Sequence, residues 1–417
     1  MRKLKASALQ YVIIISIIAV LLCGLFIISV YNGGRIIDDK AILSRLESDV
    51  KSAITVYLAN ANNFQVSSSG SAEKAPDDIE LHETNWGIYR IVTARASHNY
   101  LNLQKTYLVG EDISQNPVIA LYVPNNTLYV SASGKTIIKG DCYLPANGIR
   151  PDYSGINGFV GDSLPYGKVF KSDDRLPEID EDVLKNAFVY TVSDSIKQNV
   201  SIDVLEDSKP LSNSFSKPTI VFDSKEDVTL TCPVISGNIV VKSASIIRVS
   251  SSCKLYDVIL VAPIVVLEQG FNGNVQVFAT RSITVNQDSK ILYPSSLVVL
   301  GSETSSEESR FIQLKENTVF CGTIVLQTKE YSTNMSKIKL DEKSVVYGFV
   351  YTNTKTEIAG AVYGCIYTNK FYMETPSRIT ENLLHNVIID ARKLPRDFSR
   401  AMIFKQKNKL RVVNLLQ

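Results

Sequence analysis

Paired carboxylates are the first chemistry to look for in this chain, because hydrolysis of a glycosidic bond needs two acids about 5–9.5 Å apart. Asp257, Glu268 and Asp288 lie in a region of short apolar segments, but each takes a different position relative to those segments. No histidine lies between His98 and His385, so this region holds no imidazole base. The chain contains no GxSxG or HExxH motif. We therefore expect no catalytic site, no cofactor and no metal.

The six cysteines are the second group with potential chemistry. None forms a CxxC pair and the histidines are scattered, so the spacing does not fit a zinc site. Cys232 and Cys253 are separated by about one unit of the repeat described below. Stacked units lie about 4.8 Å apart, and a disulfide joins Cα atoms about 5.5 Å apart, so these two could be bridged. The alternative is a pair of buried free thiols, because cysteine packs as a small apolar residue.

Tyrosines that recur at one place in the repeat form the third candidate site. Tyr256, Tyr293, Tyr347 and Tyr363 each stand just before an apolar segment, and Phe320 is expected at the same place. Such an aromatic stripe could contact a glycan by stacking on its sugar rings. It could equally be a structural ladder that covers the edge of the core, which we favour because the residues recur at one position.

The element that must position these residues is a repeat of short apolar segments. The segments begin at Asn238, Asp257, Asn274, Ser296, Gly322, Gly348 and Gly364, at intervals of 16 to 26 residues. Two further β-branched runs often follow within a unit, which predicts three strands per repeat. A unit of about 20 residues with small or polar corners is typical of a solenoid. The predicted fold class is mainly β, with a parallel β-helix over residues 118–375 and an insertion at 146–217 that holds one helix near 180–187.

The N-terminus predicts a membrane anchor. Residues 11–31 carry no charge, and about 20 apolar residues cross the hydrocarbon core as a helix. Arg2, Lys3 and Lys5 precede the span and place the short N-terminus (1–10) in the cytoplasm. The predicted location is the inner (cytoplasmic) membrane, crossed once, with a periplasmic or other extracytoplasmic body.

A break at Asn32-Gly33-Gly34 and a separate amphipathic helix over residues 35–62 are predicted next. Asp38 and Asp39 would cap the start of this helix. Its apolar face is expected to contain Leu43, Leu46, Val50, Ile54, Tyr57, Leu58 and Ala61. Residues 63–117 are predicted to form a polar linker and a small β region. Residues 376–417 are predicted to form a C-terminal cap, with a helix or a helix followed by a strand near 379–389, and a basic tail.

The charge of the chain is unevenly placed. The formal net charge is +2, yet the last 42 residues carry nine basic and three acidic side chains and the first ten carry three basic ones. The remaining body is therefore mildly acidic. An acidic body argues against a groove for nucleic acid.

The leader and the middle of the chain resemble a known group of proteins. Lys5-Ala6-Ser7-Ala8-Leu9-Gln10 before the span, the segment KTIIKGDCYLP at 135–145, GIRP at 148–151, Tyr166-Gly167-Lys168 and Leu176-Pro177 resemble uncharacterised single-span membrane proteins of the Bacteroidota with a β-helix ectodomain. This resemblance implies a gene setting beside pilus-like or type II secretion-like components, and no site residues. The N-terminal helices also resemble those of type IV pilins and pseudopilins, but no Gly precedes the apolar run and no Glu lies early within it.

Two functions follow from these patterns. The leading hypothesis is a structural protein that is anchored in the membrane and serves as a scaffold or docking surface for an envelope assembly. Its expected partners are envelope proteins or further copies of itself, with residues 146–217 and 302–337 as contact regions. The alternative is a β-helix at the cell envelope that binds or processes glycans.

Overall fold

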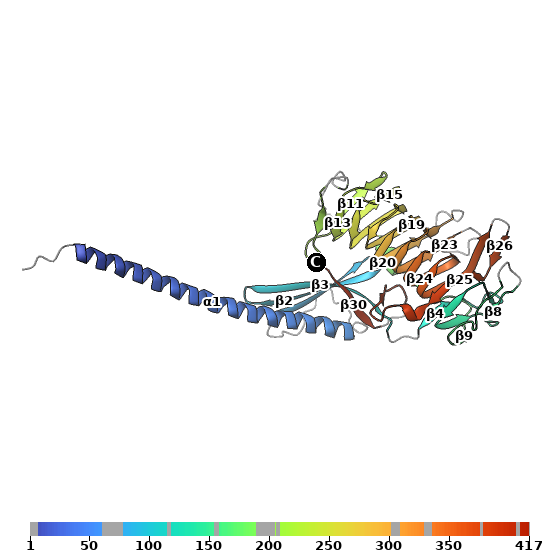
Figure 1. The fold of residues 1–417 in the computed structure, drawn as a ribbon, viewed down its shortest axis with the longest axis horizontal. Helices are drawn as coiled ribbons and strands as arrows, with labels where there is room; N and C mark the ends of the chain where they lie inside the picture. The colour runs from blue at the N-terminus through green and yellow to red at the C-terminus, as the bar shows by residue number, and fades with distance from the viewer. Residues whose placement is uncertain are drawn as a thin grey trace, which may run out of the picture. The chain divides into compact units, whose positions relative to one another are not determined.

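The computed structural model of the protein describes residues 7–60, 78–114, 118–153, 158–188, 205, 209–301, 309–328, 336–375, 378–405 and 409–416. Residues 61–77, which include the start of the linker and β region predicted at 63–117, lie outside the described part, as do residues 154–157, 189–204, 206–208, 302–308 and 329–335. The protein is mainly β, with one long apolar helix at its N-terminus (Figure 1). It divides into two compact units. One comprises Met1–Tyr57, Gln65–His82 and Thr93–Lys105; the other comprises Leu58–Phe64, Glu83–Val92 and Thr106–Gln417.

Helix α1 (Ser7–Asn60) is continuous over its whole length. The predicted break at residues 32–34 and the separate helix beginning at residue 35 are therefore wrong, and Asp38 and Asp39 are interior helical residues. Nothing lies within 4 Å of the place where a Cβ would stand on Gly33 or Gly34. Glycine costs only about 1 kcal/mol in a helix interior. The long helical stretches on both sides outweigh this cost, because restarting a helix requires a new and unfavourable nucleus.

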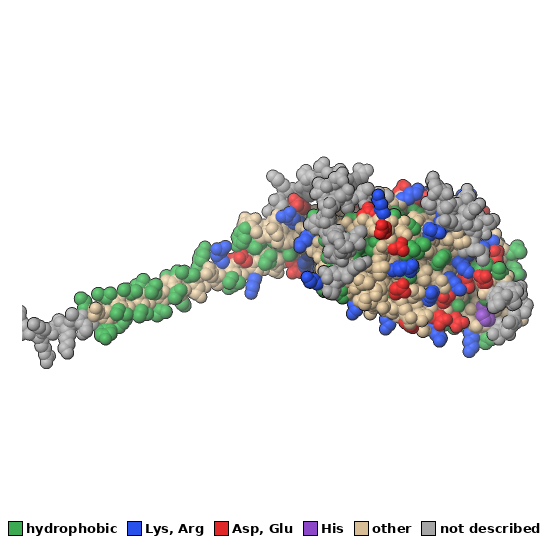
Figure 2. All heavy atoms as spheres, turned by 90° about the horizontal axis from the view of Figure 1, so that it is seen from above, with side chains coloured by type: hydrophobic (Ala, Val, Ile, Leu, Met, Phe, Trp, Pro, Cys, Tyr) green, Lys and Arg blue, Asp and Glu red, His purple; other side chains and the backbone are tan. Residues whose placement is uncertain are grey.

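The two halves of α1 differ in their surroundings. The first half contains a window of mean hydropathy 3.1 that is 0% buried, so α1 is a candidate membrane span by length and composition. Apolar side chains cover the face of this half that Figure 2 shows. In the second half Leu46, Val50, Ile54 and Tyr57 are buried on the predicted face, whereas Leu43 of that face is 38% exposed and Ala61 lies outside the described residues. The helix therefore combines an exposed apolar half with a half that packs against protein.

A small sheet contains the strands that follow α1. Strands β1 (Asp78–Trp86), β2 (Tyr89–His98) and β3 (Leu101–Asp112) pair in that order. Strands β29 (Ser399–Arg400) and β30 (Leu410–Leu416) pair antiparallel with β3, so the predicted basic tail ends in a paired strand. Within the first unit, Lys105 Nζ lies 2.7 Å from Glu47 Oε1, and Tyr100 Oη donates to Asp39 Oδ1.

Short strands make up most of the second unit. In chain order they are β4 (Ile119–Tyr122), β5 (Val130–Ser133), β6 (Ile137–Lys139), β7 (Asp141–Leu144), β8 (Ile149–Pro151), β9 (Val169–Lys171), β10 (Leu211–Asn213), β11 (Ile220–Ser224), β12 (Val228–Leu230), β13 (Val234–Gly237), β14 (Ile239–Ser243), β15 (Ile246–Val249), β16 (Lys254–Tyr256), β17 (Val258–Leu267), β18 (Asn272–Gly273), β19 (Val275–Val285), β20 (Lys290–Leu300), β21 (Phe311–Leu314), β22 (Val319–Gln327), β23 (Lys337–Leu340), β24 (Val345–Ile358), β25 (Ala361–Thr375), β26 (Arg378–Glu381), β27 (Leu383–His385) and β28 (Ile388–Asp390). Helix α2 (Glu181–Phe188) lies where a helix was predicted, and a 3-10 turn covers Ala391–Lys393.

Parallel pairing between neighbouring repeats organises these strands into rows. In one row β11 pairs with β14, β14 with β17 and β17 with β19, each with its counterpart one repeat later. The longer strands turn a corner between two rows, which explains the register shifts between Ala262 and Ile264 and between Ile291 and Ser295. Alternate residues point inward, as the period of a strand requires.

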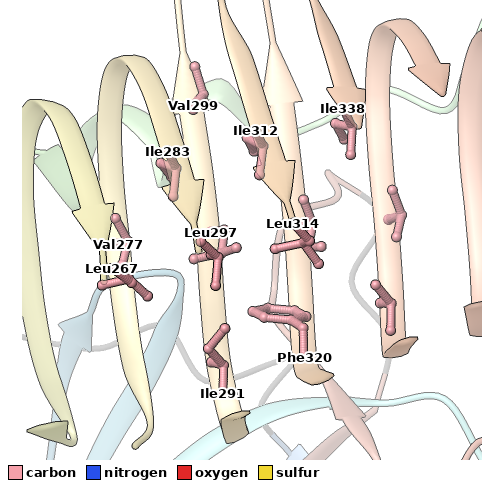
Figure 3. Close-up of a cluster of buried hydrophobic side chains, with 14 of the residues drawn as sticks. Leu267, Val277, Ile283, Ile291, Leu297, Val299, Ile312, Leu314, Phe320 and Ile338 are labelled. Atoms are coloured by element: carbon pink, nitrogen blue, oxygen red, sulfur yellow. The ribbon is translucent and has the colours of Figure 1, made fainter. Parts of the chain in front are cut away.

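The inward side chains form one apolar core. Neighbouring repeats place apolar residues side by side: Figure 3 shows Ile291 next to Phe320 and Ile312 next to Ile338, with Leu297 on the same strand as Ile291. All five side chains are fully buried. Burial of a side chain of this size stabilises the fold by about 1.5–3 kcal/mol, so the rows are held together mainly by this core.

A column of glycines marks one corner of the rows. Gly322, Gly348 and Gly364 pair with one another in register and have φ angles of 149–156°, a conformation that favours glycine. A Cβ on Gly348 would stand 1.8 Å from the carbonyl oxygen of Gly322. The predicted segment starts at these three residues are therefore positions where the backbones approach too closely for any side chain.

The rows do not follow the order of the chain. Beyond β25 the next strands come from the N-terminal part: Ile366 of β25 pairs with Leu121 of β4, and β28 pairs with β6. The helix predicted near 379–389 is therefore wrong, because this segment forms the strands β26, β27 and β28. Asn382 and Asn386 have positive φ angles, which place turns between these strands and interrupt any helix.

The segment 146–217 connects the two ends of the rows. Its strand β9 pairs with β7 at one end, and its strand β10 pairs with β13 at the other. It was predicted to be an insertion that projects from one repeat, but it contributes strands to the rows, and its described residues 176–188 pack on their outer face. Tyr351 Oη of β24 donates to Pro177 O at 3.2 Å, and the Phe188 ring lies 5.5 Å from the Phe278 ring of β19.

Candidate functional site

A cavity of about 910 Å³ lies on the outer face of β24 and β25. Phe349 and Tyr367 contribute from these two strands, and Phe398 and Phe404 contribute from the C-terminal segment that passes over them. The aromatic side chains come close to one another: the ring centroids of Phe349 and Tyr367 are 5.0 Å apart, and those of Phe349 and Phe404 are 5.7 Å apart. The cavity is therefore apolar at its floor and along one wall.

Cations surround this floor. Arg392, Arg396, Arg400 and Lys405 all line the cavity. Arg400 is 9% exposed, and its guanidinium lies 4.5 Å from the centroid of the Phe404 ring and 4.9 Å from that of Phe349. Lys405 Nζ lies 2.7 Å from Glu178 Oε2. Two of these four cations are compensated by ion pairs within the protein, since Lys405 is paired with Glu178 and Arg400 with Glu111.

The cavity also contains one thiol. Burial raises the pKa of Cys365 to about 11, although the nearby Arg400 acts in the opposite direction. The thiol is therefore protonated at neutral pH, and a protonated thiol is a poor nucleophile. The arrangement suits binding of an apolar group with an anionic end better than covalent chemistry.

A ladder of aromatic rings extends from the cavity across the strands that follow β25. Tyr367, Tyr122, Tyr143 and Phe170 occupy paired positions on β25, β4, β7 and β9. Successive ring centroids are 5.2, 5.5 and 5.1 Å apart, which is favourable for aromatic pairs. We call these four residues the outer ladder. The spacing of these residues in the sequence does not reveal the ladder, because its order depends on the pairing of β4 with β25.

The predicted tyrosine stripe is only partly brought together. Tyr347 and Tyr363 are paired in register, and their ring centroids are 5.0 Å apart. Tyr293 instead contacts the C-terminal segment, because its Oη donates to Ser399 O and accepts from Ser399 N at 3.1 Å. Tyr256 is 36% exposed on β16. Among these four tyrosines, the described ring contact is that between Tyr347 and Tyr363. The glycan contact and the ladder along all four tyrosines therefore stay predictions.

Phe320 does not belong to that stripe. It is fully buried in the core, and its partner on β24 is Val346. The residue opposite Tyr347 is Cys321. A displacement of one residue along a strand moves a side chain to the opposite face, so the placement of Phe320 beside the tyrosines was wrong.

Cys232 and Cys253 are both buried and both free thiols. Cys232 Sγ donates to Lys209 O at 2.9 Å. Burial, with a smaller contribution from Cys232, raises the pKa of Cys253 to about 12. Each thiol therefore has the environment of a core side chain, and a disulfide between them stays a prediction.

The three carboxylates considered for catalysis hydrogen-bond to amides of neighbouring repeats. Asp257 Oδ1 accepts from Asn274 Nδ2 at 2.7 Å, and burial raises the pKa of Asp257 while this hydrogen bond lowers it. Glu268 accepts from Asn286 at 3.2 Å, and Asp288 accepts from Gln269 at 3.0 Å. These bonds fix corners between repeats. Within the described part of the chain, no group of three or more His, Cys, Asp or Glu side chains is placed to hold a metal ion.

Comparison with protein-family models, with curated proteins and with solved structures finds no match.

Proposed function

We propose that this protein is a structural component of the cell envelope, anchored by α1 and without enzymatic activity, that serves as a scaffold or docking surface for a pilus-like or secretion-like assembly. The observation that carries the proposal is α1 itself. Its first half is fully exposed and apolar, whereas Leu46, Val50 and Ile54 in its second half are buried against protein. An uninterrupted helix of this kind can hold a folded part close to the membrane that anchors it.

The body is proposed to be a parallel β-helix. Parallel pairing from one repeat to the next, inward columns of aliphatic side chains and a corner column of glycines support this assignment. A body of stacked repeats is stiff and presents a long surface, which suits contact with partners.

The orientation proposed is an N-terminus in the cytoplasm and a body in the periplasm or outside the cell, with the inner membrane crossed once. The basic residues before the span support it. Alkaline phosphatase fused after Gln417 should be active in cells, because that enzyme folds only outside the cytoplasm, and a fluorescent protein that requires the cytoplasm should stay dark at the same position. The reverse pattern would refute the orientation.

Membership of an assembly is tested by purification from native membranes. A tagged full-length protein should enrich pilus-like or secretion-like components over a tagged single-span protein of unrelated sequence. If it enriches none of them, the link to such a machine fails even when the orientation is correct.

A further inference from the structure

The row of strands that ends at β9 has an open edge. β9 pairs with β7 on one side, and no described strand pairs with its other side. Lys168 O accepts from Cys142 N at 2.8 Å, and Ser172 N donates to Leu144 O at 2.9 Å. The main-chain groups of even-numbered residues therefore point toward β7.

The main-chain N–H and C=O groups on the open side of β9 belong to the odd-numbered residues. Because main-chain direction alternates along a strand, the N–H and C=O groups of Val169 and Lys171 point away from β7. Their side chains and that of Phe170 are exposed, with Val169 at 49% and Phe170 at 39%. An exposed strand edge with apolar side chains is a template for pairing with another strand.

Phe170 is also the last ring of the outer ladder. Tyr143 covers one face of its ring at 5.1 Å, and no described aromatic residue covers the other. The edge thus offers both unpaired main-chain groups and an open aromatic face at the same place.

We propose that β9 pairs antiparallel with β9 of a second copy of this chain, with the two Phe170 residues directly opposite each other. Val169 of each molecule then faces Lys171 of the other, and their outward main-chain groups form four hydrogen bonds, the pattern of an antiparallel hydrogen-bonded pair. Phe170 takes the position between these bonds, where opposite Cα atoms are about 4.5 Å apart. The two rings then meet, and the outer ladder continues from one molecule into the other.

Charge selects the second copy and the antiparallel direction. Lys168 stands at the start of the exposed strand, and Asp173 and Asp174 follow its end; all three are exposed. Antiparallel pairing brings the basic start of each strand beside the acidic end of the other, twice, around a two-fold axis that uses the same patch on both molecules. Parallel pairing would instead place Lys168 beside Lys168 and the aspartates beside aspartates. This contact depends only on the edge of the row, not on the membrane anchor or an envelope partner.

Disulfide trapping tests the register. Phe170→Cys, in a Cys23→Ser background because Cys23 is exposed, places two thiols at a Cα separation within the range of a disulfide, about 4.4–6.8 Å. Mild oxidation of the full-length protein in its native membranes should convert most of it to a dimer that reductant reverses. Val160→Cys is the control, since Val160 is 64% exposed but lies off the strand, and it should stay monomeric. No dimer with Phe170→Cys, equal dimer with both variants, or a cross-link to a different protein overturns the proposal.

A matched pair of substitutions tests the charge at the contact without cross-linking. Val169→Lys places like charges opposite Lys171 of the partner and should convert the detergent-solubilised dimer to monomer in light scattering. Val169→Glu places an opposite charge there and should keep the dimer. Both variants add a charged side chain at the same exposed position, so a difference between them does not come from misfolding. The same mass for both variants would contradict the proposed register.

Discussion

Arg400 and Glu111 form an ion pair in which Nη2 and Oε2 are 2.5 Å apart and Nε donates to the same oxygen at 2.7 Å. Glu111 belongs to β3 and Arg400 to β29, so the pair joins an early strand to the C-terminal segment. Both side chains are nearly inaccessible, at 3% and 9% exposed. Desolvation of two charges is costly, and the pair is favourable only while both partners are present. It therefore fixes the C-terminal segment beside the cavity.

Removal of one partner should be strongly destabilising. Arg400→Met keeps an unbranched side chain over the aromatic rings but leaves the Glu111 carboxylate buried without the guanidinium of Arg400. We expect a loss of about 3–5 kcal/mol in the free energy of unfolding. Urea unfolding followed by the fluorescence of Trp86, the single tryptophan, measures this loss. Lys405→Met is the control, because its pair with Glu178 is exposed and such pairs contribute about 0.2–1 kcal/mol. Equal effects of the two substitutions would contradict the structural role of Arg400.

Glycine to alanine should have opposite effects at two positions. At Gly348 the new Cβ would overlap the carbonyl oxygen of Gly322, and the φ angle of 149° adds conformational strain of about 1–3 kcal/mol. Gly348→Ala should therefore lower the thermal unfolding temperature clearly. Gly33→Ala meets nothing within 4 Å in the interior of α1 and should stabilise that helix by about 1 kcal/mol. If Gly348→Ala is tolerated as well as Gly33→Ala, the corner column does not need glycine.

Buried thiols should be unreactive in the native protein and should make it sensitive to alkali. Burial raises the pKa of Cys142 and Cys253 to about 12, above their ordinary value of 9.0. The stabilisation by the protonated thiols is complete below pH 9 and is lost as the pH rises toward 12, because the unfolded thiols ionise first. Mass spectrometry should detect alkylation of Cys142 at pH 8 only after denaturation, and the same holds for Cys253 if it is not bridged to Cys232. Rapid alkylation of the folded protein would contradict their burial.

The same denatured sample, digested without reductant, tests the predicted Cys232–Cys253 bridge. In the oxidising environment outside the cytoplasm, the bridge predicts one linked peptide pair. Two separate alkylated peptides would show that both thiols stay free, as they are in this structure.

Tyr351 should hold the connecting segment on the outer face of the rows. Its hydroxyl donates to Pro177 O at 3.2 Å, and the side chain is buried. Tyr351→Phe removes this hydrogen bond and should cost about 0.5–1.5 kcal/mol, with faster amide hydrogen exchange in residues 176–184. Tyr129→Phe changes an exposed tyrosine (38%) and should leave that exchange unchanged. Unaltered exchange in Tyr351→Phe would show that other contacts hold the segment.

Local patterns in the sequence predicted the local structure well. The spacing of Leu46, Val50, Ile54 and Tyr57 gave the buried face of α1, because a helix repeats every 3.6 residues whatever surrounds it. The predicted segment starts at Gly322, Gly348 and Gly364 recur at paired positions, but these lie inside β22, β24 and β25 and not at the start of the strands. The break at residues 32–34 was wrong because a glycine pair is a weak helix breaker when strong helical stretches flank it.

The order of the repeats could not be predicted from the sequence. Each repeat offers the same pattern of β-branched residues and turns, so nothing local distinguishes a neighbour in the chain from a neighbour in space. The pairing of Leu121 with Ile366 depends on how the ends of the rows of strands fit together, which is a property of the assembled core. The outer ladder and the cavity depend on this order, so neither could be predicted from the sequence.

The pairing of β4 with β25 has a consequence for how the protein is made. The ribosome synthesises β4, β6 and β7 long before β25 and β28. The early strands β4 and β6 therefore stay unpaired on this side until the later strands have been synthesised. Pairings between such distant segments form slowly, and unpaired strand edges on a nascent chain are prone to aggregation. A chain that stops before residue 361 would leave the edge of β4 without its partner. The early repeats can therefore join the core only after the last repeats have been synthesised, because β4 and β6 pair with β25 and β28.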